Sequence, residues 1–370
     1  VEAELRLGLG LEDMRQLPDG EWSPTNSKPV LSLGGLNVLA EKASHGIYES
    51  LREAGKDIQH NVLIIGLDTD QGAMITVERI VDRYKTSVDE LLKTPFFLYL
   101  EEYETLVGSN EEPPLLDLTS LIINHPNFLG VISHIKDTCI QAFTRLGIKC
   151  YHLPTSSEDK DPARISDRIA SLYSDRPVTF VFWGSYQDYS GNNRYGRGQN
   201  IVDALVSNLI HNNDNVRLLI KSTPGRALHC KERYPKNVEV VTDYLPDADL
   251  RDLLYTGDIF LLPSVQVHSA SLTDAFSYGM PVIASNGWGM SEYCFNGLNS
   301  LTGDRDDSLP NNSEYVDRML PRLIALCGDR GLLAKMSENT LAWYNSNHSR
   351  ENHKANLHRL VDLAMSRHVK

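Results

Sequence analysis

Cysteines are few in this sequence, and they are scattered. The five are Cys139, Cys150, Cys230, Cys294 and Cys327, and none of them belongs to a C-x-x-C pair. An odd and widely spaced set argues against a disulfide framework and against a zinc site. Free thiols are typical of a reducing compartment, so we expect the protein to be cytoplasmic.

Long apolar runs are also missing. Stretches such as residues 259–263 have only the length of a strand, so we expect no transmembrane segment. The sequence starts at Val1 without a basic region followed by an apolar run, so we expect no secretory signal.

Basic residues are in the minority. There are 36 lysines and arginines against 49 aspartates and glutamates, which gives a net charge of −13. Broad nucleic-acid binding requires a basic face, so we do not expect a partner of that class. This balance still permits a small basic pocket for a phosphorylated ligand.

The composition that remains is that of an ordinary globular protein. Of the 370 residues, 41% are hydrophobic and 23% are charged, and the length suits two domains. From Pro29 onward, short apolar runs alternate with helical stretches, which predicts two α/β units with parallel sheets covered on both faces. The polar segment 154–162, which a proline bounds at each end, has the composition of a linker between them.

The expected elements follow from the spacing of apolar residues. In the first half we expect a turn at Gly34-Gly35, a long helix from about Val38 to Gly55, an amphipathic helix at about 74–93, and strands at 30–33, 62–66, 96–100, 129–133 and 151–154. In the second half we expect helices at about 199–211, 247–256, 271–279 and after 314, and strands at 178–184, 216–221, 238–241, 259–263, 281–284 and 297–302.

Cationic residues follow two predicted strands of the second half. The loop after strand 178–184 contains Arg194 and Arg197, and strand 216–221 ends in Lys221. The carboxyl ends of parallel strands share one edge of a sheet, so these side chains can converge on one anion. Each charge alone is typical of a solvated surface, but together they favour a phosphate site.

A loop rich in small residues connects strand 259–263 to a helix that starts near Ser269 to Ser271. The amides of a first helical turn and the positive end of the helix dipole suit a phosphate group. We expect Ser269 or Ser271 to cap this helix. An ordinary capped helix without a ligand is the alternative.

The segment 263–303 resembles the donor-binding region of the retaining glycosyltransferases of family 4. That family's pattern contains Pro-Ser, then Glu-Ala-x-(Ala/Ser)-x-Gly-x-Pro-Val-Ile-Ala, and later a Gly, a Glu and Asp/Asn-Gly. The corresponding residues here are Pro263-Ser264, the run from Asp274 to Ala284, and then Gly287, Glu292 and Asn296-Gly297. The likeness extends back to about residue 178, with Arg197-Gly198 in place of the usual Lys-Gly, and it is much weaker in the first half.

The resemblance implies a fold and a division into parts. The fold is α/β of the GT-B type, in which two Rossmann-like doubly wound parallel-sheet domains face each other across a cleft. The four parts are an N-terminal arm, an acceptor domain, a nucleotide-sugar donor domain and a final helix that crosses back to the acceptor domain, at residues 1–28, 29–154, 155–349 and 350–370.

The resemblance also implies an activity. The protein would transfer a sugar from a UDP- or GDP-sugar to an acceptor, with retention of the anomeric configuration, and would require no cofactor besides this co-substrate. The sequence contains no His/Asp cluster with metal-ligand spacing, so we expect no metal. The acceptor is not identified and belongs to one of four classes, namely glycan, lipid, protein or small molecule.

The family's roles carry over to individual positions. Arg197, Lys221 and helix amides around Ser271 and Leu272 would stabilise the leaving diphosphate, and Asp274 would hold the ribose. Tyr244 would border the nucleobase, unless its loop serves only as a turn that caps the next helix. The expected catalytic residues are Arg197, Lys221, Gln266 and His268. The expected donor-binding residues are Gly184, Arg194, Tyr244, Leu245, Ser269, Ser271, Leu272 and Asp274. On the acceptor side we expect Gly34, Gly35, His125 and His134.

One position departs from the family. The family places two glutamates eight residues apart; Asp274 matches the second, and Gln266 stands at the first. A glutamine amide bonds sugar hydroxyls but carries no charge. Two alternatives stay open. The missing glutamate favours a non-catalytic nucleotide-sugar-binding protein of the same fold. It argues against the other alternative, a GT-B nucleotide-sugar epimerase, which would need several carboxylates in the cleft.

Overall fold

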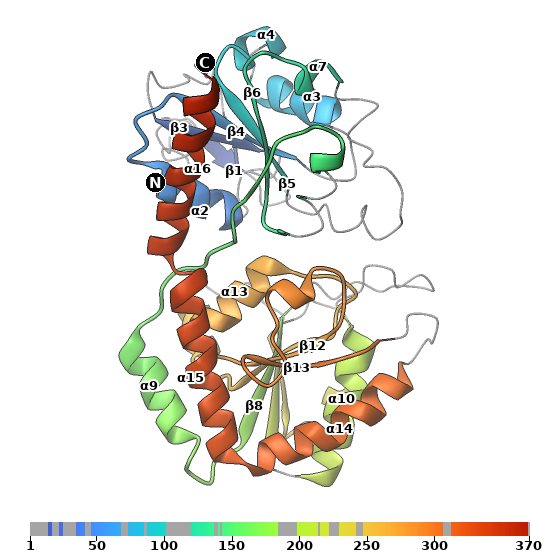
Figure 1. Ribbon diagram of the computed structural model, residues 1–370. Helices are drawn as coiled ribbons and strands as arrows, with labels where there is room; N and C mark the ends of the chain where they lie inside the picture. Colours follow the sequence, from blue (N-terminus) through green and yellow to red (C-terminus); the bar gives the residue numbers. More distant parts are fainter. Residues whose placement is uncertain are drawn as a thin grey trace. The chain divides into compact units, whose positions relative to one another are not determined.

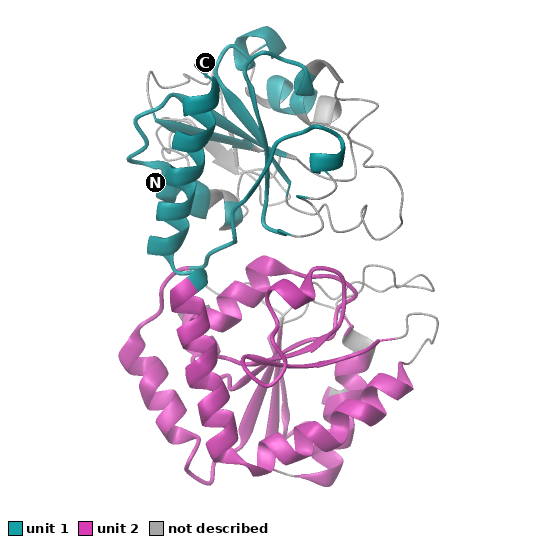
Figure 2. Cartoon of the chain, viewed as in Figure 1, with its two compact units in different colours: residues 1–157, 347–370 teal, residues 158–346 magenta. Residues whose placement is uncertain are grey.

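The computed structural model of the chain contains two compact units (Figure 2). Unit 1 consists of residues 1–157 and 347–370, and unit 2 consists of residues 158–346. The chain therefore passes between the units twice. The structure describes residues 14–16, 22–24, 35–40, 46–67, 73–84, 87–100, 120–136, 140, 143–183, 198–213, 215–221, 229–241, 247–305 and 312–368.

A five-stranded parallel sheet is the centre of unit 1 (Figure 1). Its strands lie in chain order, and they are β3 Leu36–Ala40, β4 Val62–Leu67, β5 Phe96–Leu100, β6 Phe128–Ser133 and β7 Cys150–His152. All residues of the central strand β5 are buried, as expected for a strand covered on both faces. A separate antiparallel pair, β1 Met14–Gln16 with β2 Trp22–Pro24, contains the described residues of the expected N-terminal arm.

The helices of unit 1 include the last helix of the chain. They are α2 Gly46–Gly55, α3 Ala73–Tyr84, α4 Val88–Leu91, α7 Ser120–Ile123 and α16 Arg350–His368. Helix α16 lies alongside α2 (Figure 1). Nζ of Lys354 donates to the Asp57 carboxylate, and Nε2 of His358 lies 3.0 Å from the carbonyl oxygen of Ala54. Helix α16 therefore packs in the same unit as α2, although unit 2 lies between them in the sequence.

Two buried histidines join the two chain segments of unit 1. Nδ1 of His348 lies 2.9 Å from the carbonyl oxygen of Thr155, and Nδ1 of His353 lies 2.8 Å from that of Pro154. A carbonyl only accepts, so each Nδ1 carries the hydrogen. Burial lowers the pKa of both imidazoles to about 4, so both are neutral at pH 7.

A six-stranded parallel sheet is the centre of unit 2. Its strand order is β10-β9-β8-β11-β12-β13. The strands are β8 Val178–Trp183, β9 Val216–Lys221, β10 Val238–Val241, β11 Ile259–Leu262, β12 Val282–Ser285 and β13 Ser300–Gly303. The order reverses between β8 and β11, because β9 and β10 extend one side of β8 while β11 to β13 extend the other.

Helices cover this second sheet. They are α9 Pro162–Ser171, α10 Gln199–Asn212, α11 His229–Arg233, α12 Asp247–Leu254, α13 Ser269–Ser277, α14 Ser313–Gly328 and α15 Arg330–Asn347. Apolar side chains of α9, α10, α14 and α15 pack with those of the strands in one core. The α/β class with parallel sheets in both units is confirmed.

Two expectations for the first half are wrong. Val38 and Leu39 belong to strand β3, not to a long helix, and the helix starts only at Gly46. Val38 pairs with Ile64 of β4, so sheet pairing overrides a helical spacing in the sequence. The expected helix 74–93 is two helices, α3 and α4, and Ser87 caps the second of them. The expected strand 30–33 lies outside the described residues.

None of the helices in the described part of the chain is both long and apolar enough to cross a membrane.

Candidate functional site

The reversal of strand order in unit 2 marks a place where a ligand can bind. Open parallel sheets bind ligands outside the carboxyl ends of the strands at such a point, because the loops on its two sides diverge. Here it lies between β8 and β11. The described strands of unit 1 follow chain order without a reversal.

Two helices start beside this reversal, α10 after β8 and α13 after β11. Gly198, the N-cap of α10, has a φ of 78°, and a Cβ there would lie 2.2 Å from the carbonyl oxygen of Pro263. Only glycine tolerates both the dihedral angle and the contact. The start of α10 therefore lies directly against the loop that leads from β11 to α13.

The start of α13 differs from the expectation. His268 is the N-cap and its side chain forms no capping hydrogen bond, so the expected N-cap at Ser269 or Ser271 is wrong. The N–H of Leu272 donates to the carbonyl oxygen of His268 at 3.0 Å and is thus part of the helix. Helix geometry provides no acceptor four residues earlier for the amides of the first turn, which include those of Ser269 and Ala270.

The loop that contains Gln266 is held by backbone pairing. Gln266 and Trp288 form a parallel bridge, in which the N–H of Trp288 donates to the carbonyl of Val265 at 2.9 Å. A Cβ at Gly287 would lie 2.5 Å from the same carbonyl oxygen, so this approach requires glycine. Gln266 is only 8% exposed and lies in a fixed segment beside α13.

Trp288 is a residue of this edge that the sequence analysis missed. It lies on the loop after β12, paired with the loop after β11. The signal for it was the pair of glycines around it, Gly287 and Gly289, which is typical of a backbone in close approach.

The backbone of Lys221 lies at the end of a strand, as expected. Strand β9 ends at Lys221, which is in register with Trp183 at the end of β8. Of the Lys221 side chain nothing is described. Other expected donor residues lie outside the described residues, namely Gly184, Arg194, Arg197, Tyr244 and Leu245.

The carboxylate of Asp274 forms an ion pair. Nζ of Lys160 lies 3.2 Å from Oδ1 of Asp274, and it also lies 4.8 Å from the ring centroid of Tyr278. The Lys160 side chain is 5% exposed, whereas that of Asp274 is 41% exposed. Burial raises the pKa of Tyr278, and the nearby Asp274 charge raises it further. No pattern in the sequence pointed to Lys160, which lies in the segment between β7 and α9.

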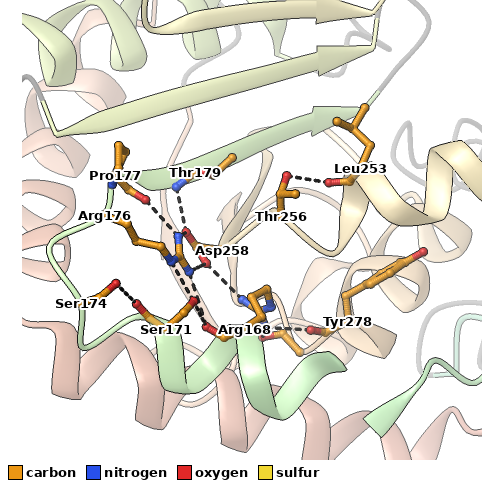
Figure 3. Close-up of polar contacts among 11 residues, drawn as sticks. Arg168, Ser171, Ser174, Arg176, Pro177, Thr179, Leu253, Thr256, Asp258 and Tyr278 are labelled. Carbon is orange, nitrogen blue, oxygen red and sulfur yellow. Dashed lines mark hydrogen bonds and ion pairs between the residues drawn. The ribbon is translucent and has the colours of Figure 1, made fainter. Parts of the chain in front are cut away.

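A buried charge cluster fixes α13 from its other end (Figure 3). Asp258 is fully buried before β11 and accepts two hydrogen bonds from the Arg176 guanidinium, both at 2.7 Å. Arg168 of α9 lies 3.4 Å from the same carboxylate and donates to the carbonyl of Tyr278 at 2.8 Å. Burial lowers the pKa of Arg168, and the Asp258 charge opposes this shift. The cluster connects α9, the sheet and the end of α13.

Gly279 closes α13. Its φ is 67°, its N–H donates to the carbonyl of Phe276 at 2.8 Å, and the N–H of Met280 donates to that of Ala275 at 3.1 Å. This is the Schellman arrangement with glycine at the left-handed position. The glycine of the family motif thus has a structural explanation, since it ends the helix that carries Asp274.

The expected acceptor-side residues lie at opposite edges of the unit 1 sheet. His134 directly follows β6 at the carboxyl edge and is buried. Gly35 directly precedes β3, and His125 precedes β6, where its ring contacts Phe96. Both therefore lie at the amino edge, away from the edge where such sheets bind ligands. Gly34 lies outside the described residues.

The described residues contain no group of three or more His, Cys, Asp or Glu side chains that could hold a metal ion.

Residues 178–318 match the family model of group 1 glycosyl transferases. No curated protein matches the sequence.

Three solved structures illustrate the likeness of the fold. HepE of Anabaena in complex with UDP-glucose has a TM-score of 0.55 and 13% identity, over 81% of this chain and 78% of HepE. A glycosyltransferase from Rickettsia africae has a TM-score of 0.54 and 12% identity, over 84% of this chain and 77% of its own. Sucrose-phosphate synthase from Thermosynechococcus elongatus has a TM-score of 0.51 and 13% identity, over 83% of this chain and 74% of the synthase.

The chain thus has the GT-B fold. The match of residues 178–318 to the family model and this fold together support a GT-B glycosyltransferase.

Proposed function

We propose that the protein transfers a sugar from a nucleotide-diphosphate-sugar to an acceptor with retention of the anomeric configuration. The observation that carries this proposal is the contact of Gly198 with Pro263, which brings the starts of α10 and α13 together at the strand-order reversal. Two helix N-termini and the strand end at Lys221 give this edge a positive potential, which suits a diphosphate.

The charge that develops during transfer explains the proposed roles. The bond from the anomeric carbon to the β-phosphate oxygen breaks, so negative charge grows on the leaving diphosphate. Arg197, Lys221 and the amides of Ser269 and Ala270 would stabilise it, and such stabilisation is usually the largest catalytic contribution. The acceptor oxygen bonds to the anomeric carbon on the face that the diphosphate leaves, and its proton passes to the departing phosphate oxygen. This route retains the configuration and uses no protein nucleophile.

The remaining donor contacts are proposed from the resemblance and from the geometry. Asp274 would bind the ribose hydroxyls, and Gln266 and His268 would contact the sugar. Tyr244 and Leu245 would border the base. A UDP-hexose is the proposed donor because HepE, a structural neighbour, is solved with UDP-glucose. We assign the acceptor to unit 1, where His134 lies at the carboxyl edge of the sheet.

The thiols support a reducing location, the cytoplasm. Cys150, Cys294 and Cys327 are free, and burial raises the pKa of each to about 12. Such thiols neither form disulfides nor react readily. We propose no cofactor besides the nucleotide-sugar.

A non-catalytic nucleotide-sugar-binding protein is the second candidate. The observation that favours it is Gln266, which is neutral where the family has a glutamate and which backbone pairing holds in place.

Incubation with UDP-glucose, UDP-N-acetylglucosamine and GDP-mannose, with mixed acceptors, tests the proposal. Released nucleoside diphosphate together with a new α-configured glycoside supports the transferase. Binding without turnover supports the second candidate, and an isomerised donor indicates an epimerase. The absence of binding to any nucleotide-sugar would refute the proposed site itself.

A further inference from the structure

Lys160 is a buried lysine in the segment between β7 and α9. Its side chain is 5% exposed, and a buried ammonium is costly unless a charge or a ring compensates it. The groups around it are Asp274 at 3.2 Å, Glu158 at 4.0 Å and the Tyr278 ring at 4.8 Å. The nearest of these is the carboxylate that the proposed function assigns to the ribose.

The segment that contains Lys160 is already fastened to unit 2 by its neighbours. Glu158 accepts from Arg251 at 2.7 Å, and Asp159 accepts from the hydroxyl of Tyr344 at 2.9 Å. The N–H of Asp161 donates to the hydroxyl of Tyr255 at 2.8 Å. Because three neighbouring contacts hold the backbone in place, the Lys160 side chain is not required for this purpose.

The two partners of the ion pair differ in exposure. Asp274 is 41% exposed, so a ligand can reach its carboxylate from solvent, while the ammonium approaches from the protein side. An aspartate carboxylate rotates broadly about its last torsion. A cation at Oδ1 restricts that rotation.

We propose that Lys160 is a positioning residue that orients the Asp274 carboxylate for the ribose hydroxyls of the donor. This inference rests on the proposed function, because it assumes that Asp274 faces a ribose. It explains why a lysine is buried against an aspartate that is one methylene shorter than the glutamate of the family: the ion pair fixes the shorter group.

Calorimetric titration with nucleoside diphosphates tests the inference. The probe is UDP or GDP, whichever the wild-type protein binds more tightly, together with its 2′,3′-dideoxy counterpart, which lacks both ribose hydroxyls. We expect Lys160→Met to weaken binding of the complete nucleotide about 10-fold, because an oriented charged hydrogen bond is lost. We expect the same variant and the wild type to bind the dideoxy compound equally.

Three further variants sharpen the test. Lys160→Arg keeps the cation and should restore most of the affinity. Lys160→Met combined with Asp274→Asn should bind no more weakly than Asp274→Asn alone, since both changes remove one interaction. Lys335→Met removes an exposed lysine of α15 that pairs with Glu338, far from this segment in the sequence, and should leave the affinity unchanged. If Lys160→Met does not fold, Lys160→Gln replaces it.

Equal weakening toward both nucleotides would overturn the inference, because Lys160 would then act on the phosphates or on the fold. Unchanged affinity for the complete nucleotide would overturn it as well. If the wild type binds neither UDP nor GDP, the proposed function fails first, and this inference fails with it.

Discussion

Asp258 is a charged residue without solvent contact, and its environment determines what it contributes. Two bonds from Arg176 and the N–H of Thr179, at 2.9 Å, satisfy its oxygens. Replacing Asp258 leaves the buried Arg168 guanidinium and the partly buried Arg176 guanidinium without their counter-charge. We expect Asp258→Ala to lower the free energy of unfolding by about 3–5 kcal/mol in urea denaturation.

Asp252 is the matched control for that change. It pairs with Arg164 at 2.6 Å, but both side chains are exposed. We expect Asp252→Ala to change the free energy of unfolding by less than about 1 kcal/mol. Similar losses for both variants would mean that the Asp258 cluster is no stronger than a surface ion pair.

The proposed diphosphate contacts give a second prediction at this scale. Lys221→Ala and Arg197→Ala should each weaken UDP binding or transfer about 10- to 100-fold, because each removes a charge-assisted hydrogen bond to phosphate. The far-ultraviolet circular dichroism should stay unchanged. Lys335→Ala is the control, since Lys335 is an exposed lysine of α15 that pairs with Glu338. Wild-type kinetics in both variants would show that the diphosphate does not bind there.

The two positions of the family's acidic pair give a third prediction. Asp274→Asn should weaken the affinity for UDP more than Gln266→Ala does, because UDP has the ribose that Asp274 would bind but lacks the transferred sugar that Gln266 would contact. Isothermal titration with UDP alone measures both changes. The reverse order would mean that the match of Asp274 to the second acidic residue of the family is out of register.

At the scale of elements, the end of α13 depends on one glycine. The backbone φ of Gly279 is 67°, and an added Cβ would lie 3.2 Å from the carbonyl oxygen of Ser337. We expect Gly279→Ala to destabilise the protein by about 1–2 kcal/mol through the left-handed angle, with crowding in addition. Thermal unfolding of Gly328→Ala provides the control, because a Cβ at Gly328 meets nothing within 4 Å. Equal melting temperatures for the two variants would contradict this account.

The sequence predicted an element well where its residue pattern fits only one kind of secondary structure. The run 96–100 is apolar throughout and is bounded by Pro95, so it reads as a buried strand, which β5 confirms. The end of α13 was also readable, because glycine followed by proline within two residues is a stop signal for a helix. Val38 and Leu39 fit a strand and a helix equally, and their pairing with β4, which the sequence does not display, decides between the two.

The site could be predicted only as far as local patterns reach. The end of a strand follows from local spacing, and the position of Lys221 at the end of β9 is confirmed in the backbone. Lys160 lies opposite Asp274 only because the segment after β7 folds back on α13. Trp288 meets Gln266 through the pairing of two loops. Contacts between distant positions depend on tertiary packing, so no local pattern reveals them.

At the scale of the whole molecule, the buried histidines of unit 1 predict a dependence of stability on pH. Histidine ordinarily has a pKa near 6.5, and burial lowers that of His348 and His353 to about 4. Between these values the unfolded chain binds protons that the folded chain does not. The free energy of unfolding therefore falls as the pH falls from about 6.5 to about 4.

Urea unfolding at pH 7 and pH 5 measures this effect. Each histidine should account for a loss of about 2 kcal/mol over that interval. The double variant His348→Asn with His353→Asn keeps donors for the carbonyls of Thr155 and Pro154 but does not titrate, so its loss should be smaller. His211→Asn, at an exposed position of α10, should behave as the wild type does. Equal pH dependence in all three proteins would contradict the linkage.

The division of unit 1 into residues 1–157 and 347–370 has a consequence for how the protein is made. On the ribosome, residues 158–346 emerge together, so unit 2 is able to fold while synthesis continues. Unit 1 must wait for α16, which is translated after unit 2 and packs on a helix translated some three hundred residues earlier. A premature stop codon near residue 346 would thus release a nearly finished second unit attached to a first unit that lacks its closing helix.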